Sequence, residues 1–548
     1  MTTRTKPSAE DSHPRARHRA SASKGDVRIA AIDIGSNSIR QIVADVSPTG
    51  AIRVVDEMKA APRLGAGIQE TGRLSTPSMA AALAALKRMS ALGKQLGAKR
   101  RRVVATSAVR EASNGAEWLA LVRKEAGLRV SILDGEDEAR LSFLSALAHF
   151  DLGSGRAVVV DIGGGSLELA LSADGLVERL ASLPFGAIRL TEKYFSKGIT
   201  PAALRKLRRA VRKKLKEALP GKDWTGAQLI GSGGTFTNLG GIVLARHGVQ
   251  TARTVHGTRV ARVELEHIVD TLAAFSPEER LAMPGLNSGR ADIITAGLAA
   301  VAEVLARFDA KEIVVSGYGI REGILLELAH VTPRPADPGE ARERSVRALA
   351  ERTQFEEPHA RHVQKLALRL FDSIGARLGC AQDERQLLAD AALLHDIGYH
   401  INYDKHHKHS YHLISHAELL GMTPVEQVVI ANVARYHRGA EPKRTHANFG
   451  PLSPASRKRI YRLAALLRVA DGFDRGHAGA VDDIRVRWLD RAIRLTAVPS
   501  PKAPSVRLEL WGASKKSRML ADYAGVPVEI VAPGGETFTH EDDGTPVD

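Results

Sequence analysis

The chain has 548 residues, of which 44% are hydrophobic and 26% charged, the composition of a soluble globular protein. This length is too great for one ordinary core, so we expect several domains. No segment approaches 18 consecutive apolar residues, which argues against a membrane-spanning helix. The formal net charge of +16 favours a polyanionic partner, although a generally basic proteome would give the same figure.

Cysteine content and the N-terminus point to the compartment. The single cysteine, Cys380, excludes an intramolecular disulfide and suits a reducing environment. Residues 1–27 are rich in Arg, Ser, Ala and Pro, lack the apolar centre of a secretory signal, and predict a disordered basic tail. We therefore expect a cytoplasmic protein.

The rest of the chain predicts alternating strands and helices, then a helical region. Strand–turn–strand patterns are expected at 27–46 and 156–177, and helices at 77–98, 135–150 and 202–219. The dense Pro, Gly and charged residues around 330–345 indicate a linker. Near the C-terminus, 484–498, 506–512 and 526–533 read as strands, with a helix at 514–525. The expected units are a tail (1–27), two α/β domains (28–150 and 151–330), a linker (331–344), a helical domain (345–480) and a small α+β segment (481–548).

One sequence frame occurs twice, 128 residues apart. "AIDIGSNSI" (31–39) and "VVDIGGGSL" (159–167) share two apolar residues followed by Asp-Ile-Gly-x-x-Ser. This spacing is the size of a small domain. We therefore expect two similar α/β domains that face each other, each with one glycine hairpin in a shared cleft.

Glycine turns that follow strands are suited to phosphate, because backbone N–H groups can approach an anion where there is no Cβ. Two further turns of this kind are "GSGGT" (231–235) and "SGYG" (316–319). Ser36, Asn37, Ser38 and Ser166 add side-chain donors. Any one such cluster is common, but four after strands favour a phosphate site.

Several carboxylates accompany these turns. Asp33 and Asp161 each end a strand that reads as buried, where a charge is costly unless it is paired or bound to metal. A hairpin can bring Glu168 back beside Asp161, and carboxylates suit Mg²⁺ held jointly with phosphate. Alternatively, Asp161 caps its own turn and Glu168 faces solvent.

An acidic cluster, Glu136, Asp137 and Glu138, stands at a predicted helix start. Ordinary helix-end electrostatics accounts for most of it, but one carboxylate there can face the cleft and orient a water for attack on phosphorus. Arg110 can clamp a phosphate through two hydrogen bonds, or lie on the surface.

These residues together resemble the exopolyphosphatase / guanosine pentaphosphate phosphohydrolase (Ppx/GppA) family of the actin-like ATPase superfamily. Six motifs occur in the family's order between residues 28 and 328: "IDIGSNSIR", "ATSAVREASN", "GEDEARL", "VDIGGGSLEL", "IGSGGT" and "SGYGIREG". The chain departs from the pattern at Leu167, where Thr is commoner. The resemblance implies two ribonuclease-H-like domains around a cleft that hydrolyses a terminal phosphoanhydride with Mg²⁺.

The resemblance also assigns residues by motif. Glu138 matches the catalytic glutamate that activates water, with Asp161, Glu168 and Arg110 as the other catalytic residues. Asp161 and Glu168 would hold Mg²⁺. The expected phosphate-binding residues are Asp33, Ser36, Asn37, Ser38, Gly163, Gly164, Gly165, Ser166, Gly233, Gly234 and Thr235.

The helical region resembles the HD-type domain that longer family members append. His362 shares a helix face with Leu366 and Leu370, which directs it inward, and "HDIG" places His395 beside Asp396. With Asp471, or in its place Asp474, these residues can bind a second divalent metal. His407, His409 and His437 could serve another metal or a phosphate. A helical scaffold without metal remains the alternative.

The sequence therefore predicts an exopolyphosphatase that releases orthophosphate from inorganic polyphosphate, with basic residues 205–214 tracking the chain. Removal of the 5′-phosphate of guanosine pentaphosphate is the first alternative, and a non-catalytic regulator that binds polyphosphate or nucleotide is the second. We expect a homodimer, with no need for membrane or nucleic acid.

Overall fold

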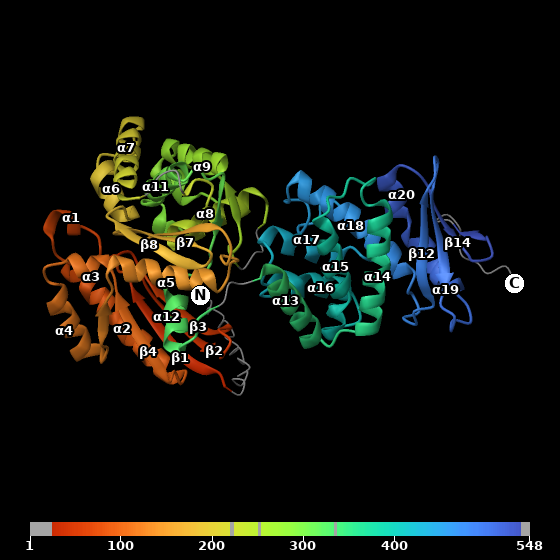
Figure 1. Cartoon of the computed structure of the whole chain (residues 1–548), viewed down its shortest axis with the longest axis horizontal. Helices are drawn as coiled ribbons and strands as arrows, with labels where there is room; N and C mark the ends of the chain where they lie inside the picture. Colours follow the sequence, from red (N-terminus) through yellow and green to blue (C-terminus); the bar gives the residue numbers. More distant parts are fainter. Residues whose placement is uncertain (1–24, 220–223, 250–253, 334–336, 539–548) are drawn as a thin grey trace, which may run out of the picture.

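The computed structural model describes residues 25–538 except 220–223, 250–253 and 334–336. Most of the predicted tail thus lies outside the described residues. Figure 1 shows two halves side by side: an α/β half made of two lobes, and a helical half that ends in a small sheet. None of the described helices is long and apolar enough to cross a membrane.

The first lobe is built on a five-stranded sheet in the order β3-β2-β1-β4-β5. β1 pairs antiparallel with β2 and parallel with β4, and β1 and β2 are almost wholly buried because helices cover the sheet. Its elements are β1 (Val27–Ile34), β2 (Ile39–Val46), β3 (Ile52–Ala60), α1 (Ile68–Thr71), α2 (Thr76–Gln95), β4 (Arg100–Ala105), α3 (Ser107–Glu111), α4 (Gly115–Ala126), β5 (Val130–Ile132) and α5 (Gly135–Leu147).

The second lobe repeats this plan, with strand order β10-β11-β9-β6-β7-β8. β6, β7 and β8 form the same antiparallel meander, and β9 pairs parallel with β6. The expected pair of ribonuclease-H-like domains is therefore confirmed. The elements are β6 (Arg156–Ile162), β7 (Leu167–Ala173), β8 (Leu176–Leu183), α6 (Ala187–Phe195), α7 (Pro201–Ala218), β9 (Gln228–Ser232), α8 (Gly234–Arg246), β10 (Arg259–Ala261), α9 (Arg262–Ala274), α10 (Pro277–Leu281), η2 (Ser288–Arg290), α11 (Ile294–Arg307), β11 (Glu312–Val315) and α12 (Ile320–Ala329).

Two helices cross between the lobes. α5 precedes the second sheet in the chain but packs on its strands β6, β7 and β8, whereas α12 follows that sheet and packs on β1 and β2 of the first. The two helices also pack against each other. At their crossing Gly323 is so close to α5 that a methyl group on it would lie 2.2 Å from the Leu141 carbonyl oxygen. A division of the chain near residue 150 therefore does not separate the packing units.

The helical half shares one continuous hydrophobic core with the C-terminal strands. The sheet has the order β12-β13-β14-β15. The prediction of a strand at 506–512 is wrong, because residues 507–512 belong to helix α19. The elements are α13 (Pro338–Arg352), α14 (Glu357–Ile374), α15 (Glu384–Leu394), η3 (Ile397–His400), α16 (His406–His416), α17 (Pro424–Arg435), α18 (Pro454–Gly472), β12 (Val481–Trp488), β13 (Ile493–Pro499), α19 (Arg507–Lys516), α20 (Arg518–Ala524), β14 (Val528–Val531) and β15 (Thr537–Phe538).

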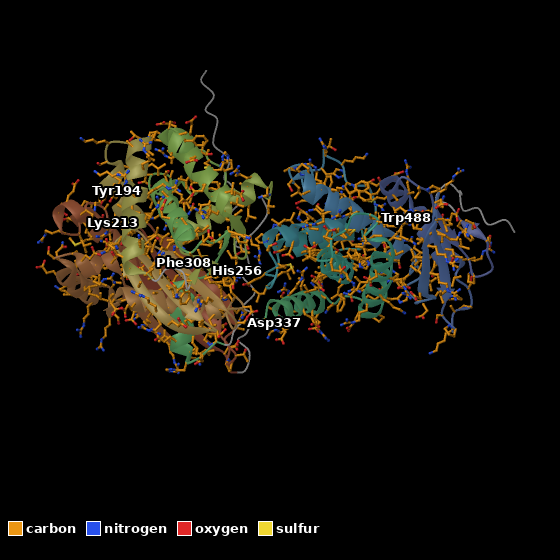
Figure 2. All side chains as sticks on the ribbon, turned by 45° about the horizontal axis from the view of Figure 1, so that its top comes forward. Tyr194, Lys213, His256, Phe308, Asp337 and Trp488 are labelled. Atoms are coloured by element: carbon orange, nitrogen blue, oxygen red, sulfur yellow. The ribbon has the colours of Figure 1, made fainter. Side chains whose placement is uncertain are left out.

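The two halves meet through the second lobe. Figure 2 shows His256 on the side of that lobe that faces the helical half, and Asp337 where the helical half begins. Asp337 caps α13, which starts at Pro338, within the segment predicted as linker. The Tyr318 hydroxyl donates to Glu418 at 3.3 Å, and Val249 belongs to the core of the helical half.

The crossing of α5 and α12 generates a stability prediction. Gly323→Ala should lower the free energy of unfolding by about 1–3 kcal/mol, because the added methyl group meets backbone that cannot move aside. Gly534→Ala is the matched control, since nothing lies within 4 Å of that position. Urea unfolding followed by circular dichroism measures both variants. An unchanged midpoint for Gly323→Ala would show that the crossing is not tightly packed.

Candidate active site

The repeated sequence frame forms two hairpins of matching geometry. In the strand register, Asp33 of β1 lies opposite Arg40 of β2, and Asp161 of β6 lies opposite Glu168 of β7. Each glycine loop closes through one backbone bond, from Gly35 N–H to the Ser38 carbonyl at 3.1 Å and from Gly163 N–H to the Ser166 carbonyl at 3.0 Å. The predicted echo is thus two equivalent turns, with an arginine in the first hairpin where the second has a glutamate.

The glycine loops of the two lobes touch each other, which explains their composition. A methyl group on Gly164 would lie 2.9 Å from Cβ of Ser36, and one on Gly165 would lie 2.1 Å from Oγ of Ser107. Gly233, after β9, has a φ of 91° and faces the Asp161 carboxylate. These close approaches need glycine, and they draw the backbone amides of both lobes around one pocket.

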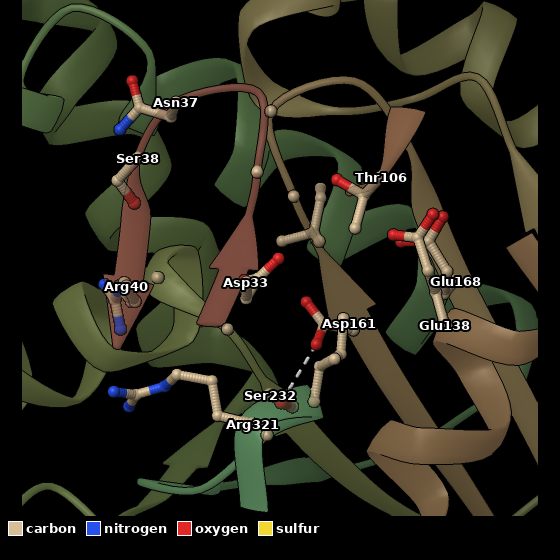
Figure 3. Close-up of a pocket in the computed structure, with 18 of the residues that line it drawn as sticks. Asp33, Asn37, Ser38, Arg40, Thr106, Glu138, Asp161, Glu168, Ser232 and Arg321 are labelled. Atoms are coloured by element: carbon tan, nitrogen blue, oxygen red, sulfur yellow. Dashed lines mark hydrogen bonds between the residues drawn. The ribbon is translucent and has the colours of Figure 1, made fainter. Parts of the chain in front are cut away.

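The three carboxylates that were predicted to be catalytic are buried at this pocket. Asp161 accepts a hydrogen bond from Ser142 at 3.0 Å. It accepts another from Ser232 at 3.1 Å, which Figure 3 shows. Glu168 accepts one from Ser182 at 2.9 Å. Glu138, in the first turn of α5, lies beside Glu168 and accepts one from Arg110 at 2.7 Å. The crossing of α5 onto the second sheet is what brings Glu138 to Glu168.

Burial raises the pKa of all these acids. Desolvation raises the pKa of Glu138 to about 8, and the hydrogen bond and charge of Arg110 oppose the rise. Burial, and then the neighbouring Glu138, raise the pKa of Glu168 well above its usual range. Burial also raises the pKa of Asp161, and raises that of Asp33 to about 6 against the charges of Arg321 and Arg40. Positive charge entering the pocket would favour the ionised forms.

Three arginines that our prediction missed line the same pocket: Arg40, Arg290 and Arg321. Arg290 is buried, and its guanidinium lies so close to Gly234 that a methyl group there would be 2.1 Å away. Burial lowers the pKa of Arg290 to about 10. The register of the first hairpin, extended by one residue past "GSNSI", could have identified Arg40. No sequence pattern distinguishes Arg290 from other arginines.

Most of the predicted phosphate-binding residues line this pocket, and a few predicted residues do not. Asp33, Gly163, Gly164, Gly233 and Gly234 are among those that do, as are the two loops' serines and Asn37. Thr235 is fully buried, and its hydroxyl donates to the Ile162 carbonyl. Arg110 lies behind Glu138, bonded to it and to the Leu133 carbonyl, so it reaches the pocket only through that acid.

Helix α7, predicted to track a polyanion, lies at the outer edge of the second lobe (Figure 1). Two of its cations, Arg208 and Arg212, bond to the buried Glu303. They serve the packing of α7 on α11. Arg205, Lys206, Arg209 and Lys213 are exposed.

The donor atoms suit a hard divalent cation. Asp33 Oδ1 and Asn37 Oδ1 are buried and make no hydrogen bond, although both residues line the pocket with Asp161 and Glu168. Carboxylate and amide oxygens are the ligands that Mg²⁺ takes together with substrate phosphates. The residues present therefore fit Mg²⁺, with Asp33 as an additional candidate ligand.

A second group of predicted residues lies in the helical half. His395, Asp396 and Asp471 converge there, but His362 does not join them, because its Nε2 bonds to the Val481 carbonyl at 2.8 Å. His359, one turn earlier on α14, takes the expected place. Of the other predicted histidines, His437 lies at the group, and His409 is partly buried.

Comparisons with known proteins cover both halves. A model of the Ppx/GppA phosphatase family matches residues 42–332, and a model of Ppx/GppA phosphatase domain III matches residues 341–496. A solved exopolyphosphatase-like protein shares 28% identity over 56% of this chain and 98% of its own, with a TM-score of 0.52. A family member from Aquifex aeolicus shares 30% identity over 56% and 98%, with a TM-score of 0.49. An exopolyphosphatase from Cytophaga hutchinsonii shares 24% identity over 55% and 98%, with a TM-score of 0.50.

The raised pKa of Glu138 predicts how stability depends on pH. When a chelator removes bound metal, burial favours the protonated form of Glu138 in the folded state. The contribution of this form to the free energy of unfolding is complete below about pH 4.5 and is lost as pH rises through about 8. The loss of unfolding free energy should exceed about 1 kcal/mol between pH 5 and pH 8, and should be smaller in Glu138→Gln. Glu136→Gln, an exposed position on the same helix turn, is the control. Equal pH dependence in all three proteins would contradict the burial argument.

Proposed function

The chain belongs to the Ppx/GppA phosphatase family, and we propose that it is an exopolyphosphatase that releases terminal orthophosphate from inorganic polyphosphate. The proposal rests on one observation: Glu138 and Glu168 are buried side by side, and two glycine loops line the same pocket. Such a site combines a base, phosphate-binding amides and ligands for a cation. Hydrolysis of a phosphoanhydride by water requires groups of these three kinds.

Each part has a role in the proposed reaction. The amides of the two glycine loops bind oxygens of the terminal phosphate, and Arg40, Arg290 and Arg321 balance the charge of the next phosphates. Glu138 accepts a proton from the attacking water, and a pKa raised toward neutrality suits a general base. The bond between the terminal phosphorus and the bridging oxygen breaks, and the chain leaves one phosphate shorter. Mg²⁺, held by Asp161 and Glu168, would neutralise charge that develops on these oxygens.

Arg110 adjusts the base in this scheme. Its guanidinium bonds to Glu138 Oε1 at 2.7 Å and lowers the pKa of that acid against the effect of burial. We assign it a positioning role rather than direct contact with phosphate. The exposed cations of α7 supply a surface on which the rest of a long polyanion can lie.

The two candidate substrates are distinguished by measuring phosphate release in parallel from long-chain polyphosphate and from guanosine pentaphosphate, both with Mg²⁺. We expect faster turnover of polyphosphate. Turnover of guanosine pentaphosphate alone would show that this nucleotide is the substrate and that the same kind of bond is hydrolysed. Tight binding of either substrate with no release would indicate a regulator and would remove the enzymatic proposal.

The role of Glu138 is tested by Glu138→Gln. This change should reduce phosphate release by at least about 100-fold, within the range for loss of a general base, while binding of polyphosphate is retained. Glu136→Gln should behave as the unmodified protein, because that side chain points to solvent. Near-normal rates in Glu138→Gln would remove Glu138 from its role.

The role of α7 is tested by neutralising its exposed cations together, with Arg205, Lys206, Arg209 and Lys213 changed to Gln. KM for long-chain polyphosphate should rise, and its dependence on salt should weaken, because fewer charge contacts remain. KM for tripolyphosphate, a much shorter chain, should not change. Equal effects on both substrates, or none on either, would exclude α7 as the track.

A further inference from the structure

The loop at 316–319, which lines the active-site pocket, is held in shape by nearby side chains. The Ser316 hydroxyl donates to the Tyr318 carbonyl at 2.9 Å and accepts from the Tyr318 N–H at 3.1 Å. The next N–H, of Gly319, donates at 2.7 Å to Glu322, a buried acid in the first turn of α12. These bonds fix the backbone on both sides of Tyr318 and so determine where its carbonyl and its ring lie.

This loop confines a hydroxyl group that donates to Asp161. Ser232 Oγ lies 3.1 Å from Asp161 Oδ2 and 3.1 Å from the Tyr318 carbonyl oxygen. A hydroxyl donates one proton, and Ser316 already donates to that carbonyl, so the Ser232 proton is available to Asp161. A methyl group on Gly319 would lie 2.8 Å from Ser232 Oγ, so the loop leaves this hydroxyl little room to turn away. Displacement of the loop would therefore weaken the hydrogen bond to a carboxylate of the cleft.

The Tyr318 ring belongs to a cluster of aromatic side chains that includes the end of α5. It stacks on His149, just beyond the last turn of α5, with the ring centroids 3.8 Å apart. It also meets the edge of His256 at 4.8 Å, and that ring lies 4.7 Å from the ring of Phe150. Such contacts restrict the position of a ring. Because the first turn of α5 carries Glu138, Tyr318 connects the loop to the helix that holds the proposed base.

The same residue contacts the helical half. The Tyr318 hydroxyl donates to Glu418 at 3.3 Å. Its ring partner His256 is followed by Gly257, on which a methyl group would lie 3.7 Å from the Met422 carbonyl oxygen. Glu418 and Met422 both belong to the segment that joins α16 to α17. One short segment of the helical half is thus in contact with the tyrosine of the pocket loop and with its neighbour.

This segment, 417–423, is anchored within the helical half on both sides of Glu418. On one side the Gln427 side chain donates to the Ala417 carbonyl at 2.9 Å. On the other side the Leu420 N–H donates to the Ser345 hydroxyl at 3.1 Å. The segment therefore moves with the helices that hold it, and Glu418 with the segment.

We infer that Tyr318 is a positioning residue through which the helical half holds the pocket loop in its place against Ser232 and α5. Tyr318 needs no contact with phosphate for this role. Its consequence for turnover rests on the proposed function, because that function makes Asp161 and Glu138 the groups that act in hydrolysis. The dependence of the loop on the helical half is a property of the fold and does not rest on the substrate.

The first test measures kcat and KM with long-chain polyphosphate and Mg²⁺. Tyr318→Phe retains the ring and removes the hydroxyl, and it should lower kcat by at least about 3-fold, the effect of one lost hydrogen bond. KM should stay within about 2-fold, because the glycine loops that would bind phosphate are unchanged. Glu418→Ala should have the same effect, and Glu418→Gln, whose amide oxygen can accept the same bond, should retain most of kcat.

The double variant Tyr318→Phe/Glu418→Ala should be no slower than either single variant, because all three lack the same hydrogen bond. Tyr403→Phe is the matched control, since that tyrosine of the helical half is 74% exposed. Effects that add in the double variant, a rise in KM without a fall in kcat, or unchanged kcat in both single variants would overturn the positioning role. Thermal unfolding by circular dichroism shows that the variants compared are folded.

The second test needs neither substrate nor activity, so its failure is distinct from failure of the proposed function. Hydrogen exchange of the full chain is followed by mass spectrometry over residues 317–322. Glu418→Ala, a change in the other half of the protein, should speed exchange there by at least about 3-fold, and Tyr318→Ala by more, because ring contacts are lost as well. Glu343→Ala, an exposed acid of α13 in the same half, is the matched control. Equal exchange in Glu418→Ala and the unmodified chain would overturn the inference.

Discussion

The cleft depends on the burial of several carboxylates in one small volume. Asp161, Glu168 and Glu138 would repel one another if all were ionised, and each therefore has hydroxyl or guanidinium donors from different elements. The serines that donate to Asp161 come from two different elements, α5 and the end of β9. A cation and a polyphosphate chain would complete this balance of charge, because the cation suits the acids and the phosphates suit the arginines opposite them.

This arrangement is possible because α5 and α12 exchange places between the lobes. α5 carries Glu138 from the first half of the sequence onto the second sheet, where Glu168 lies. α12 begins directly after the loop at 316–319, which lines the pocket, and packs on the first sheet. Each lobe thus contributes a helix to its neighbour, and the lobes cannot separate far without disturbing the residues that would act on water.

Much of this site could be predicted from the sequence, because its main features are local. The repeated frame around Asp33 and Asp161 determined the hairpin register, and a glycine loop after a buried strand is a local pattern. The predictions failed where residues far apart in the sequence determine the local structure. His359 and His362 are three residues apart on one helix face, and a carbonyl from β12, far along the chain, removes His362 from the metal group. Residues 506–512 alternate like a strand, but from Arg507 on they form helix α19, which packs on α18. Arg290 reaches the pocket through tertiary packing that no local pattern records.

In the proposed reaction, water held at Glu138 attacks the terminal phosphorus of a polyphosphate chain. Hydrolysis of tripolyphosphate in water enriched in oxygen-18 tests it directly, with mass spectrometry of both products. We expect one labelled oxygen in each orthophosphate released and none in the pyrophosphate. Label in the pyrophosphate instead would mean that water attacks the middle phosphorus and not the terminal one, and would contradict the assigned chemistry.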